Sequence, residues 1–453
     1  MKVMTSGKPA KLILGFSIPL LIGGVFQQLY NLVDVVIVGR YLGEEALAGV
    51  GSTGNLTFFL LSLVMGLCNG AGIIVAQCFG AENYRDMRRA ITAVIWVAGV
   101  LTVIMAAIGY VGSPYFLRLL DVPENVMEYS VTYLKIIYLF VFGSVVYNGC
   151  SAVLRSFGDS RTPLYALMIA SVLNIVLDLL FVVVVPLGVK GVAIATVISQ
   201  HVSGAYCLIH LFVKREQYKL KGLQRKPDKD MVNLIFKTGI PTAFQSCLIS
   251  VGGMSVQRLI NSFGTSVMAA YAAAVKVDNI AIQVIVSLGT ALSVFTGQNV
   301  GQRRFDRIKE GLRSTLFMSI GAAVGIALLA LFFGKNVMLL FLGEGGSAEA
   351  VSVGATYLSI MGAAYIICGV MQSYQNVVRG AGDVNICMVA GMTELAGRVF
   401  FAYLLAGIIG ETGIWIATPL SWGCGCVVPV IRYYTGKWKT KAYVQEDAHD
   451  KAV

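Results

Sequence analysis

Long apolar runs alternate with short polar connections along almost the whole chain. The runs are continuous and lack the alternating pattern of ~10-residue barrel strands, so they predict helices. Most of them exceed the ~20 residues that cross a hydrocarbon core as a helix. Twelve runs can be marked, at residues 12–38, 46–77, 90–112, 131–154, 163–186, 190–213, 233–261, 266–297, 314–334, 352–378, 384–409 and 412–434. The pattern predicts an all-α integral membrane protein with twelve transmembrane helices.

The composition supports this assignment. Hydrophobic residues make up 57% of the 453 residues and charged residues only 13%, against ~25% charged residues in an ordinary soluble domain. A soluble protein could not bury so much apolar surface and would aggregate. The nine cysteines lie almost entirely within the apolar runs and form no CxxC pair. We interpret them as apolar filler and expect neither a disulfide framework nor a metal site from them.

The basic residues set the expected orientation. Of the 35 Lys and Arg residues, 27 fall on the side of the N-terminus, four fall on the opposite side and four lie within the runs. The positive-inside rule then places both termini in the cytoplasm, and we expect a multi-pass protein of the inner (plasma) membrane. The net charge of +11 lies mainly in thin loops that contact anionic lipid, so no nucleic-acid partner is expected. The four basic residues on the outer side are Arg40, Arg118, Lys190 and Lys335.

The two halves of the chain repeat one another. AQCFGAENYRDMRRA recurs as GQNVGQRRFDRIKEG, LRSFGD as VRGAGD and GVAIAT as GIWIAT, in the same order and at nearly one offset. The paired positions are Gly43 with Gly264, Gln77 with Gln298, Gly80 with Gly301, Tyr133 with Tyr357, Arg155 with Arg379, Gly158 with Gly382 and Asp159 with Asp383.

Each half holds six runs, an even number, so both halves keep the same orientation in the membrane. We therefore expect two pseudo-symmetric six-helix lobes around a central cleft, the usual layout for alternating access. The sequence contains no GxxxxGK[ST] motif, so direct use of ATP is not expected. The expected boundaries are an N-lobe with helices 1–6 (1–213), a cytoplasmic linker (214–232), a C-lobe with helices 7–12 (233–436) and a cytoplasmic tail (437–453).

Few ionisable residues interrupt the runs, and an ionised Asp at mid-bilayer costs about 2.5–3.5 kcal/mol. Asp34 lies in the first run, and Asp178 lies in the fifth, one helical turn after Asn174. Two carboxylates and an amide supply hard oxygen ligands for Na⁺, or a group that takes up H⁺. We predict a cation- or proton-coupling site there, with no other metal and no cofactor. The alternative is that each Asp caps a helix end or pairs with a nearby Lys.

The second half does not copy this arrangement. Ser255 stands at the position of the first acid, and Glu394 and Arg398 are spaced for an i,i+4 ion pair. Contact with substrate is the alternative role for that pair. Lys276 and Asp278 lie in the eighth run, and the sequence assigns them no role. Unpaired acids are therefore expected in the first half alone.

Polar and aromatic side chains in several runs suit a cleft for a broad range of organic substrates. Each of them can instead mediate contact between helices. We also expect Pro19 to act as a hinge, because proline kinks a helix. The residues expected in the cleft are Gln27, Tyr30, Asn31, Asn148, Gln245 and Gln283.

These motifs resemble the MATE (multidrug and toxic compound extrusion) family over residues 8–436. The resemblance implies twelve helices in two lobes and cation-coupled drug export. The motifs that carry it are Asp34-x4-Gly39-Arg40 followed by Leu42-Gly43, the Gln77-x2-Gly80 loop with its echo at Gln298-x2-Gly301, and the Arg155-x2-Gly158-Asp159 turn with its echo at Arg379-x2-Gly382-Asp383.

Within that family the chain looks closest to the DinF-like branch. The resemblance implies a site formed by Asp34 in the first span, the Asn174-x3-Asp178 pair in the fifth and Thr196 in the sixth. The NorM-like branch relies on a Glu in the seventh span and an Asp in the tenth. This chain has amides there, with Gln245 near the first position, which speaks against a cation site in the C-lobe.

The expected function is a monomeric antiporter that exports amphipathic, often cationic organic compounds in exchange for H⁺ or Na⁺ by alternating access. Its expected partners are small organic substrates and membrane lipid, and it is not expected to be an enzyme. One alternative is a flippase for lipid-linked precursors with a related two-lobe fold. A membrane sensor is a further alternative, against which the lack of a soluble signalling domain speaks.

Overall fold

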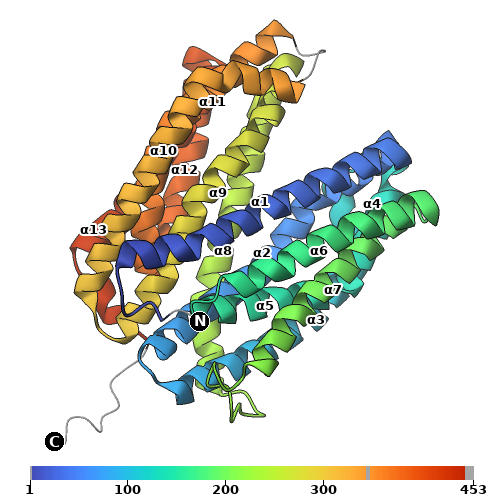
Figure 1. Ribbon diagram of the computed structural model, residues 1–453. Coiled ribbons are helices and arrows are strands. Elements are labelled where there is room, and N and C mark those ends of the chain that lie inside the picture. The colour runs from blue at the N-terminus through green and yellow to red at the C-terminus, as the bar shows by residue number, and fades with distance from the viewer. Residues whose placement is uncertain (1–2, 343–346, 444–453) are drawn as a thin grey trace, which may run out of the picture. The chain divides into compact units, whose positions relative to one another are not determined.

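The computed structural model describes residues 3–342 and 347–443, and in them the chain forms helices and no strand (Figure 1). The all-α prediction is therefore confirmed, while the predicted tail beyond residue 443 lies outside the described residues. The helices are α1 (Pro9–Leu42), α2 (Glu44–Gly80), α3 (Tyr84–Leu119), α4 (Glu124–Leu139), α5 (Phe142–Ser156), α6 (Arg161–Leu179), α7 (Val189–Val213), α8 (Lys229–Asn261), α9 (Thr265–Gly301), α10 (Phe305–Leu342), α11 (Ala348–Gly380), α12 (Val384–Ile409) and α13 (Glu411–Tyr434). A π-helical turn, η1 (Leu180–Val184), follows α6, and a 3-10 helix, η2 (Lys437–Lys441), follows α13.

Within residues 3–342 and 347–443, eleven helices are long and apolar enough to cross a membrane, and the bent pair α4 and α5 makes a twelfth span when counted as one. The fourth predicted run, 131–154, is therefore not one continuous helix. It breaks between Leu139 and Phe142 with a bend of 53°. Just after the bend, a Cβ on Gly143 would lie 2.7 Å from the backbone nitrogen of His201 on α7. The break thus lets the backbones of α5 and α7 approach each other closely.

The outer faces of the helices are apolar. Val103 on α3 and Phe332 on α10 are each 70% exposed, and many other large apolar side chains are exposed along the same helices. Such a surface would cause aggregation in water, but it suits contact with lipid tails. The chain is a multi-pass membrane protein.

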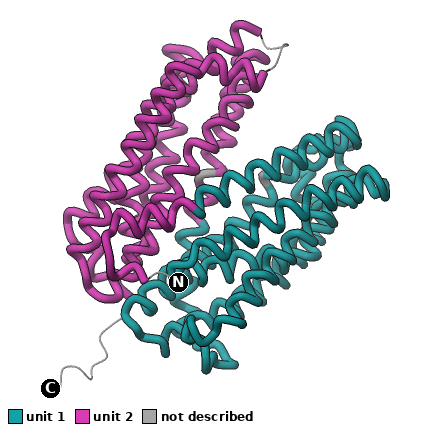
Figure 2. The backbone as a smooth tube through the Cα atoms, viewed as in Figure 1, with its two compact units in different colours: residues 1–2, 19–243 teal, residues 3–18, 244–453 magenta. Residues whose placement is uncertain are grey.

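The chain divides into two compact units (Figure 2). Unit 1 comprises Pro19–Ala243, and unit 2 comprises Val3–Ile18 together with the chain from Phe244 onward. The division falls inside α8, because the first part of α8 packs closely on α2 within unit 1. A Cβ on Gly66 would lie 2.4 Å from Ala243, and one on Gly70 would lie 2.7 Å from Gly239. The lobe boundaries expected around residues 214–232 stay a prediction.

The first described residues are held firmly within unit 2. The backbone N–H of Met4 donates to Oε1 of Gln298 (2.8 Å), and Nδ2 of Asn299 donates to the Met4 carbonyl (3.2 Å). Arg304 donates to the carbonyl of Thr5 (2.9 Å). The Met4 side chain is 1% exposed. The chain start is therefore anchored at the end of α9, before α1 continues into unit 1 at Pro19.

The repeated motifs form equivalent turns in the two units. Gly158 and Gly382 have φ values of +77° and +96°, a region that favours glycine. Asp159 and Asp383 follow and stand at the starts of α6 and α12. In unit 2, Asp383 forms an ion pair with Arg432 of α13 (2.6 Å). The repeat thus marks positions where the backbone must turn and where one helix is tied to another.

Candidate functional site

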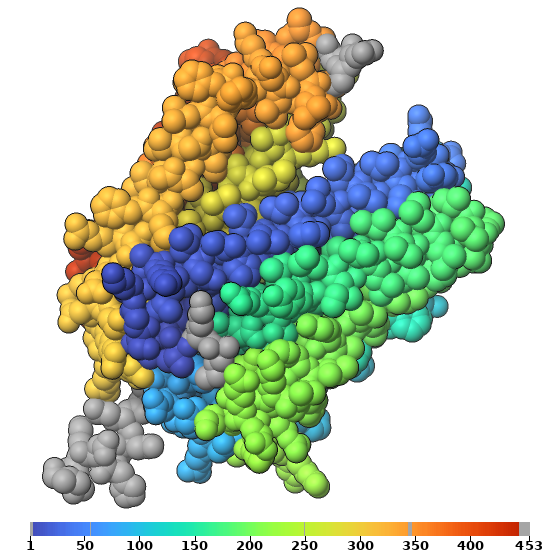
Figure 3. All heavy atoms as spheres, viewed as in Figure 1, coloured from blue at the N-terminus to red at the C-terminus, as the bar shows by residue number. Residues whose placement is uncertain are grey.

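Two acids from different helices meet within unit 1. Asp34 lies on α1 and Asp178 on α6, and their carboxyl groups are close enough to interact directly. Asp178 is 0% exposed and Asn174, one turn earlier, is 1% exposed. Figure 3 shows α1, in blue, lying along α6, in green. A Cβ on Gly23 of α1 would lie 3.6 Å from Leu164 of α6, so the two helices are in contact.

A change of helix type follows the second acid immediately. Beyond Asp178, α6 widens into the π-helical turn η1. The N–H of Val185 donates to the carbonyl of Leu180 (2.9 Å), and the N–H of Leu187 donates to that of Phe181 (2.8 Å). Short π-helical turns are rare and frequently occur at functional sites. Here the turn places Asp178 in the last regular turn of α6.

Several buried polar atoms of this cluster have no hydrogen-bond partner in the part of the chain that the structure describes. They are Oδ1 of Asp34, both carboxylate oxygens of Asp178, both amide atoms of Asn174 and Oγ1 of Thr196. Buried polar groups in native proteins are almost always satisfied, so each such group needs an explanation. A bound cation, proton or water would satisfy these oxygens. Among the described residues, no group of three or more His, Cys, Asp or Glu is arranged to hold a metal ion.

Two tyrosines complete the cluster. Tyr30 lies one turn before Asp34, and Tyr133 comes from α4; both hydroxyls lie near the two acids. Tyr133 also lies beside Thr196 of α7. Sequence reasoning expected Tyr30 in a substrate cleft and missed Tyr133 as a site residue. Its recurrence as Tyr357 was the one available signal, and recurrence alone does not distinguish a site from a packing position.

An apolar cluster closes one side of the acids. Ile37 comes almost one turn after Asp34 on α1 and packs in this cluster. The cluster therefore lies close to Asp34 along α1, and a low local dielectric strengthens interactions between charges. Its buried members are Ile37, Val38, Ala46, Val182, Val189 and Val192.

The other expected cleft residues are spread over several helices in both units. Gln27 and Asn31 are exposed on α1, and Asn148 on α5 donates to the carbonyl of Ser144, as a helix-internal contact (2.8 Å). Gln283 is half-buried on α9 of unit 2. Their role as substrate ligands stays a prediction, as does the hinge role of Pro19, which lies inside the continuous helix α1.

Gln245, the remaining expected cleft residue, is 6% exposed in unit 2. Its Oε1 accepts a hydrogen bond from Arg379 (2.7 Å), which also donates to Oδ1 of Asn376 (3.2 Å). The repeat partner Arg155 makes a similar contact in unit 1, donating to Ser151 (2.9 Å). Each of these arginines therefore turns back onto polar groups of its own unit.

Two acids of unit 2 have partners within their own unit, whereas several oxygens of the acid pair in unit 1 have none among the described residues. Arg398 donates to Glu394 at 3.0 Å, so the predicted i,i+4 ion pair is confirmed. Asp278 accepts a hydrogen bond from the hydroxyl of Tyr365. Lys276 is exposed. Tyr357, the repeat partner of Tyr133, packs edge-on against Trp415, with ring centroids 5.1 Å apart.

Comparison with known proteins gives a consistent result. The family model described as MatE matches residues 19–180 and 241–404. The probable multidrug resistance protein YpnP of Bacillus subtilis is 31% identical over 441 residues, which cover 96% of this chain and 97% of that protein. The probable multidrug resistance protein YoeA of the same organism is 29% identical over 438 residues, covering 94% and 93% of the two chains.

The fold is also shared with solved structures. A multidrug resistance MATE family transporter of the MOP superfamily, in an outward-facing conformation, has a TM-score of 0.89 to this chain at 23% identity. The match covers 96% of this chain and 98% of that one. At this identity the likeness establishes the fold, and the twelve-span, two-lobe arrangement is thereby confirmed.

Proposed function

Because the chain belongs to the MATE family of membrane transporters, we propose that it is a secondary antiporter that exports amphipathic, often cationic organic compounds while H⁺ or Na⁺ enters. The names of its relatives as multidrug resistance proteins support the substrate class. The family consists of transporters, and the chain is accordingly not an enzyme. Assignment to the DinF-like branch is part of the proposal and rests on the Asp34, Asn174 and Asp178 pattern.

The observation that carries the coupling is the set of unpartnered buried oxygens on Asp34, Asn174, Asp178 and Thr196. Two carboxylates that share a buried site cannot both ionise without strong mutual repulsion. One positive charge, H⁺ or Na⁺, relieves that repulsion. A proton would let one carboxyl group donate to the other, and Na⁺ would take oxygens of both together with those of Asn174 and Thr196.

This arrangement gives a route to exchange. When the site faces outside, uptake of a cation neutralises the acid pair; when it faces the cytoplasm, release restores the negative charge that attracts a cationic substrate. Coupling requires that the coupling ion and the organic substrate occupy the protein in turn, which is the condition for alternating access. We include Pro19 in the proposal, as the point where α1 bends when the charge on Asp34 changes.

The flippase alternative has less support. A lipid-linked precursor carries phosphate charges that need free basic groups near the cavity. Arg398, a half-buried basic residue of unit 2, is already engaged by Glu394 at 3.0 Å.

The test uses the purified protein in liposomes, with a fluorescent organic cation such as ethidium as substrate and with H⁺ and Na⁺ gradients applied separately. We expect transport against the substrate gradient with at least one of the two ions. Asp34→Asn and Asp178→Asn should fold and insert normally, yet transport no faster than the wild type does without an ion gradient.

The matched control is Asp278→Asn in unit 2, since an Asn can still accept the hydrogen bond from Tyr365. It should keep gradient-driven transport. Wild-type rates in both unit 1 variants would show that the acid pair does not couple transport.

A further inference from the structure

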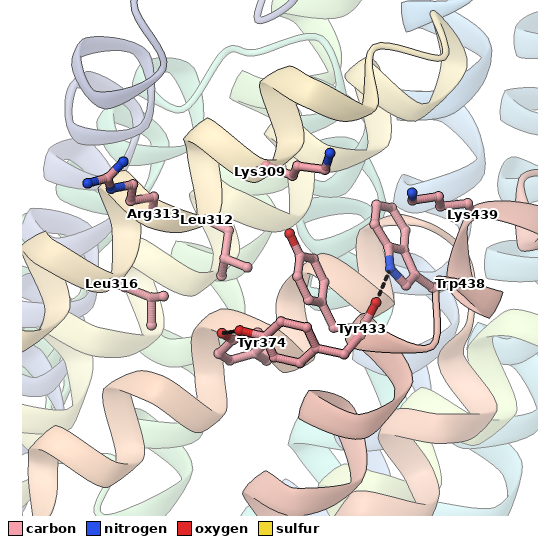
Figure 4. Close-up of a pocket in the computed structure, with 10 residues that line it drawn as sticks. Lys309, Leu312, Arg313, Leu316, Tyr374, Tyr433, Trp438 and Lys439 are labelled. Carbon is pink, nitrogen blue, oxygen red and sulfur yellow. Dashed lines mark hydrogen bonds between the residues drawn. The ribbon is translucent and has the colours of Figure 1, made fainter.

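A cavity of about 400 Å³ lies in unit 2, where the start of α10 meets the ends of α11 and α13 and the 3-10 helix η2. It is separate from the acid pair, which belongs to unit 1. Basic and aromatic side chains dominate its lining (Figure 4). None of its ten lining residues is acidic.

The turn after α13 builds the floor of this pocket. Gly436 has φ +70°, a left-handed conformation that favours glycine, and it turns the chain back on itself. Trp438 then becomes 1% exposed and donates its indole N–H to the carbonyl of Tyr433 (2.9 Å). The two rings stack with centroids 5.6 Å apart. The pocket is therefore a built feature held by packing, with fixed walls.

Two lysines stand at the mouth of the pocket. In Figure 4 the ammonium ends of Lys309 and Lys439 point toward each other above the Trp438 ring. Lys309 forms an ion pair with Asp306 (3.1 Å), whose side chain is 94% exposed, so the pair is weak and screened by solvent. Arg313, one turn after Lys309, also lines the pocket. The mouth is thus positively charged and favours an anionic occupant.

The opposite side of the pocket is apolar and continues into the lipid-facing surface. Leu312 and Leu316 line it, one turn apart on α10. Next to them Phe317 is 69% exposed, and Ile431 on α13 is 58% exposed. The pocket therefore joins a basic rim to a surface that contacts lipid tails. Tyrosine and tryptophan are enriched at this depth, where the apolar core meets the headgroups.

We propose that this pocket binds the phosphate group of an anionic phospholipid, with Lys309 and Lys439 contacting the phosphate and the leucines of α10 contacting the first acyl carbons. A soluble phosphate ester shares the charged part of this chemistry but lacks the acyl chains. The continuity of the pocket with the exposed apolar surface favours the lipid. A lipid bound there tethers the C-terminal end of α13 to α10, on the side of the membrane where most basic residues of the protein lie.

The test measures lipid binding to the full-length protein by native mass spectrometry, with phosphatidylglycerol and phosphatidylcholine of identical chains as probes. Each basic residue near an anionic surface contributes about fivefold in affinity. The double variant Lys309→Gln, Lys439→Gln should therefore bind the first phosphatidylglycerol about 30-fold more weakly than the wild type. Phosphatidylcholine binding should change little.

The matched control is Lys190→Gln, Lys335→Gln, which removes the same charge from two exposed residues that do not line the pocket. It should bind phosphatidylglycerol like the wild type. Equal melting temperatures in phosphatidylcholine would show that all variants fold. Unchanged binding in the pocket variant, or an equal loss in the control, would refute the site. If soluble glycerol phosphate saturated the pocket while phosphatidylglycerol did not bind, the proposal that the occupant is a lipid would be refuted.

Discussion

Individual side chains in the acid cluster differ in what they offer a coupling ion. Asp178 is fully buried and Asn174 nearly so, and among the described residues their side-chain polar atoms have no geometric hydrogen-bond partner. Thr196 and the hydroxyl of Tyr133 approach from other helices. The cluster therefore draws on α1, α4, α6 and α7, and a movement of any one of them changes the set of oxygens available to the ion.

Tyr133 provides a test of this arrangement. Tyr133→Phe removes one hydroxyl but keeps the ring, and a lost hydrogen bond of ~0.5–1.5 kcal/mol corresponds to about a 2- to 13-fold change in an equilibrium constant. We expect the concentration of coupling ion that gives half-maximal transport to rise by that factor, with the maximal rate less affected.

The control is Tyr357→Phe, the same change at the repeated position of unit 2. It should leave the ion dependence as it is in the wild type. An equal effect of both substitutions would mean that Tyr133 acts through general packing and does not contact the ion.

The sequence revealed Asp34 and Asp178 because an acid inside an apolar run is conspicuous. Tyr133 could not be found in the same way, since an aromatic ring in a membrane helix is ordinary and its hydroxyl becomes informative only when the fold brings it to an acid. Asp278 is an acid that the sequence makes conspicuous but whose hydrogen-bond donor could not be predicted, because that donor, Tyr365, lies 87 residues away in sequence.

The helices are fixed to one another by turns that carry their own hydrogen bonds. Asp159 accepts from the backbone N–H groups of Arg161 and Thr162 at the start of α6 (3.0 and 3.1 Å). It also accepts from the hydroxyl of Tyr218 in the segment after α7 (2.8 Å). Although burial raises the pKa of Asp159, hydrogen bonds from Thr162, Tyr218 and Arg161 outweigh burial and hold that pKa below its usual range.

Asp159→Asn should therefore destabilise the protein by about 1–2 kcal/mol at neutral pH, the value of a helix cap and one further hydrogen bond. Because the folded-state pKa is lowered, the stabilisation is complete above the unfolded value of ~3.9. It is lost as the pH falls through the lower folded-state pKa. The difference in melting temperature between wild type and variant in detergent should narrow below about pH 4.

Asp121→Asn is the control for that experiment, because Asp121 is exposed and has φ 52°, a conformation that Asn tolerates well. It should melt like the wild type at every pH. A difference between wild type and Asp159→Asn that does not depend on pH would contradict the role of the ionised carboxylate.

The break between α4 and α5 could not be predicted, since no proline lies at the bend and the apolar pattern runs through it without interruption. Its cause is a close approach between backbones distant in sequence. Gly143→Ala would place a Cβ 2.7 Å from the backbone of His201. We expect a loss of stability of about 1–3 kcal/mol, as for other overpacked cores.

Gly99→Ala on α3 is the matched substitution, because a Cβ there meets nothing within 4 Å. Alanine also favours a helix interior over glycine by about 1 kcal/mol, so this variant should melt at or above the wild-type temperature. Thermal unfolding in detergent measures both variants. If Gly143→Ala were as stable as Gly99→Ala, close packing would not be the reason for the bend.

Across the whole chain, the apolar runs predicted the number of spans, and the uneven distribution of basic residues predicts the topology. Lys335 lies at the sparsely charged end and Lys437 at the basic end, and both are exposed. The native cysteines are buried or half-buried, so they compete little with an engineered surface thiol.

A membrane-impermeant maleimide should therefore label Lys335→Cys in intact cells and label Lys437→Cys only after the membrane is opened. The unsubstituted protein measures the background from native cysteines. Labelling of Lys437→Cys from outside would reverse the topology and, with it, the direction of the proposed exchange.

The two-lobe arrangement followed from the repeat, but the distribution of α1 between the two units did not. Pattern and charge describe each helix separately and say nothing of which neighbours it contacts. Gln298, which anchors Met4, is a polar side chain at a helix end. Polar residues are common at such positions for many reasons, so the sequence alone did not predict this contact.

That anchor also bears on how the protein is made. Met4 and Gln298 are 294 residues apart, so at a synthesis rate of ~5–20 residues per second the start of the chain leaves the ribosome about 15–60 s before its partner exists. Helix α1 must therefore enter the membrane with its N-terminal end undocked. A segment made well before α9 is thus among the last to reach its final contacts, and correct assembly can be completed only after α9 has been inserted.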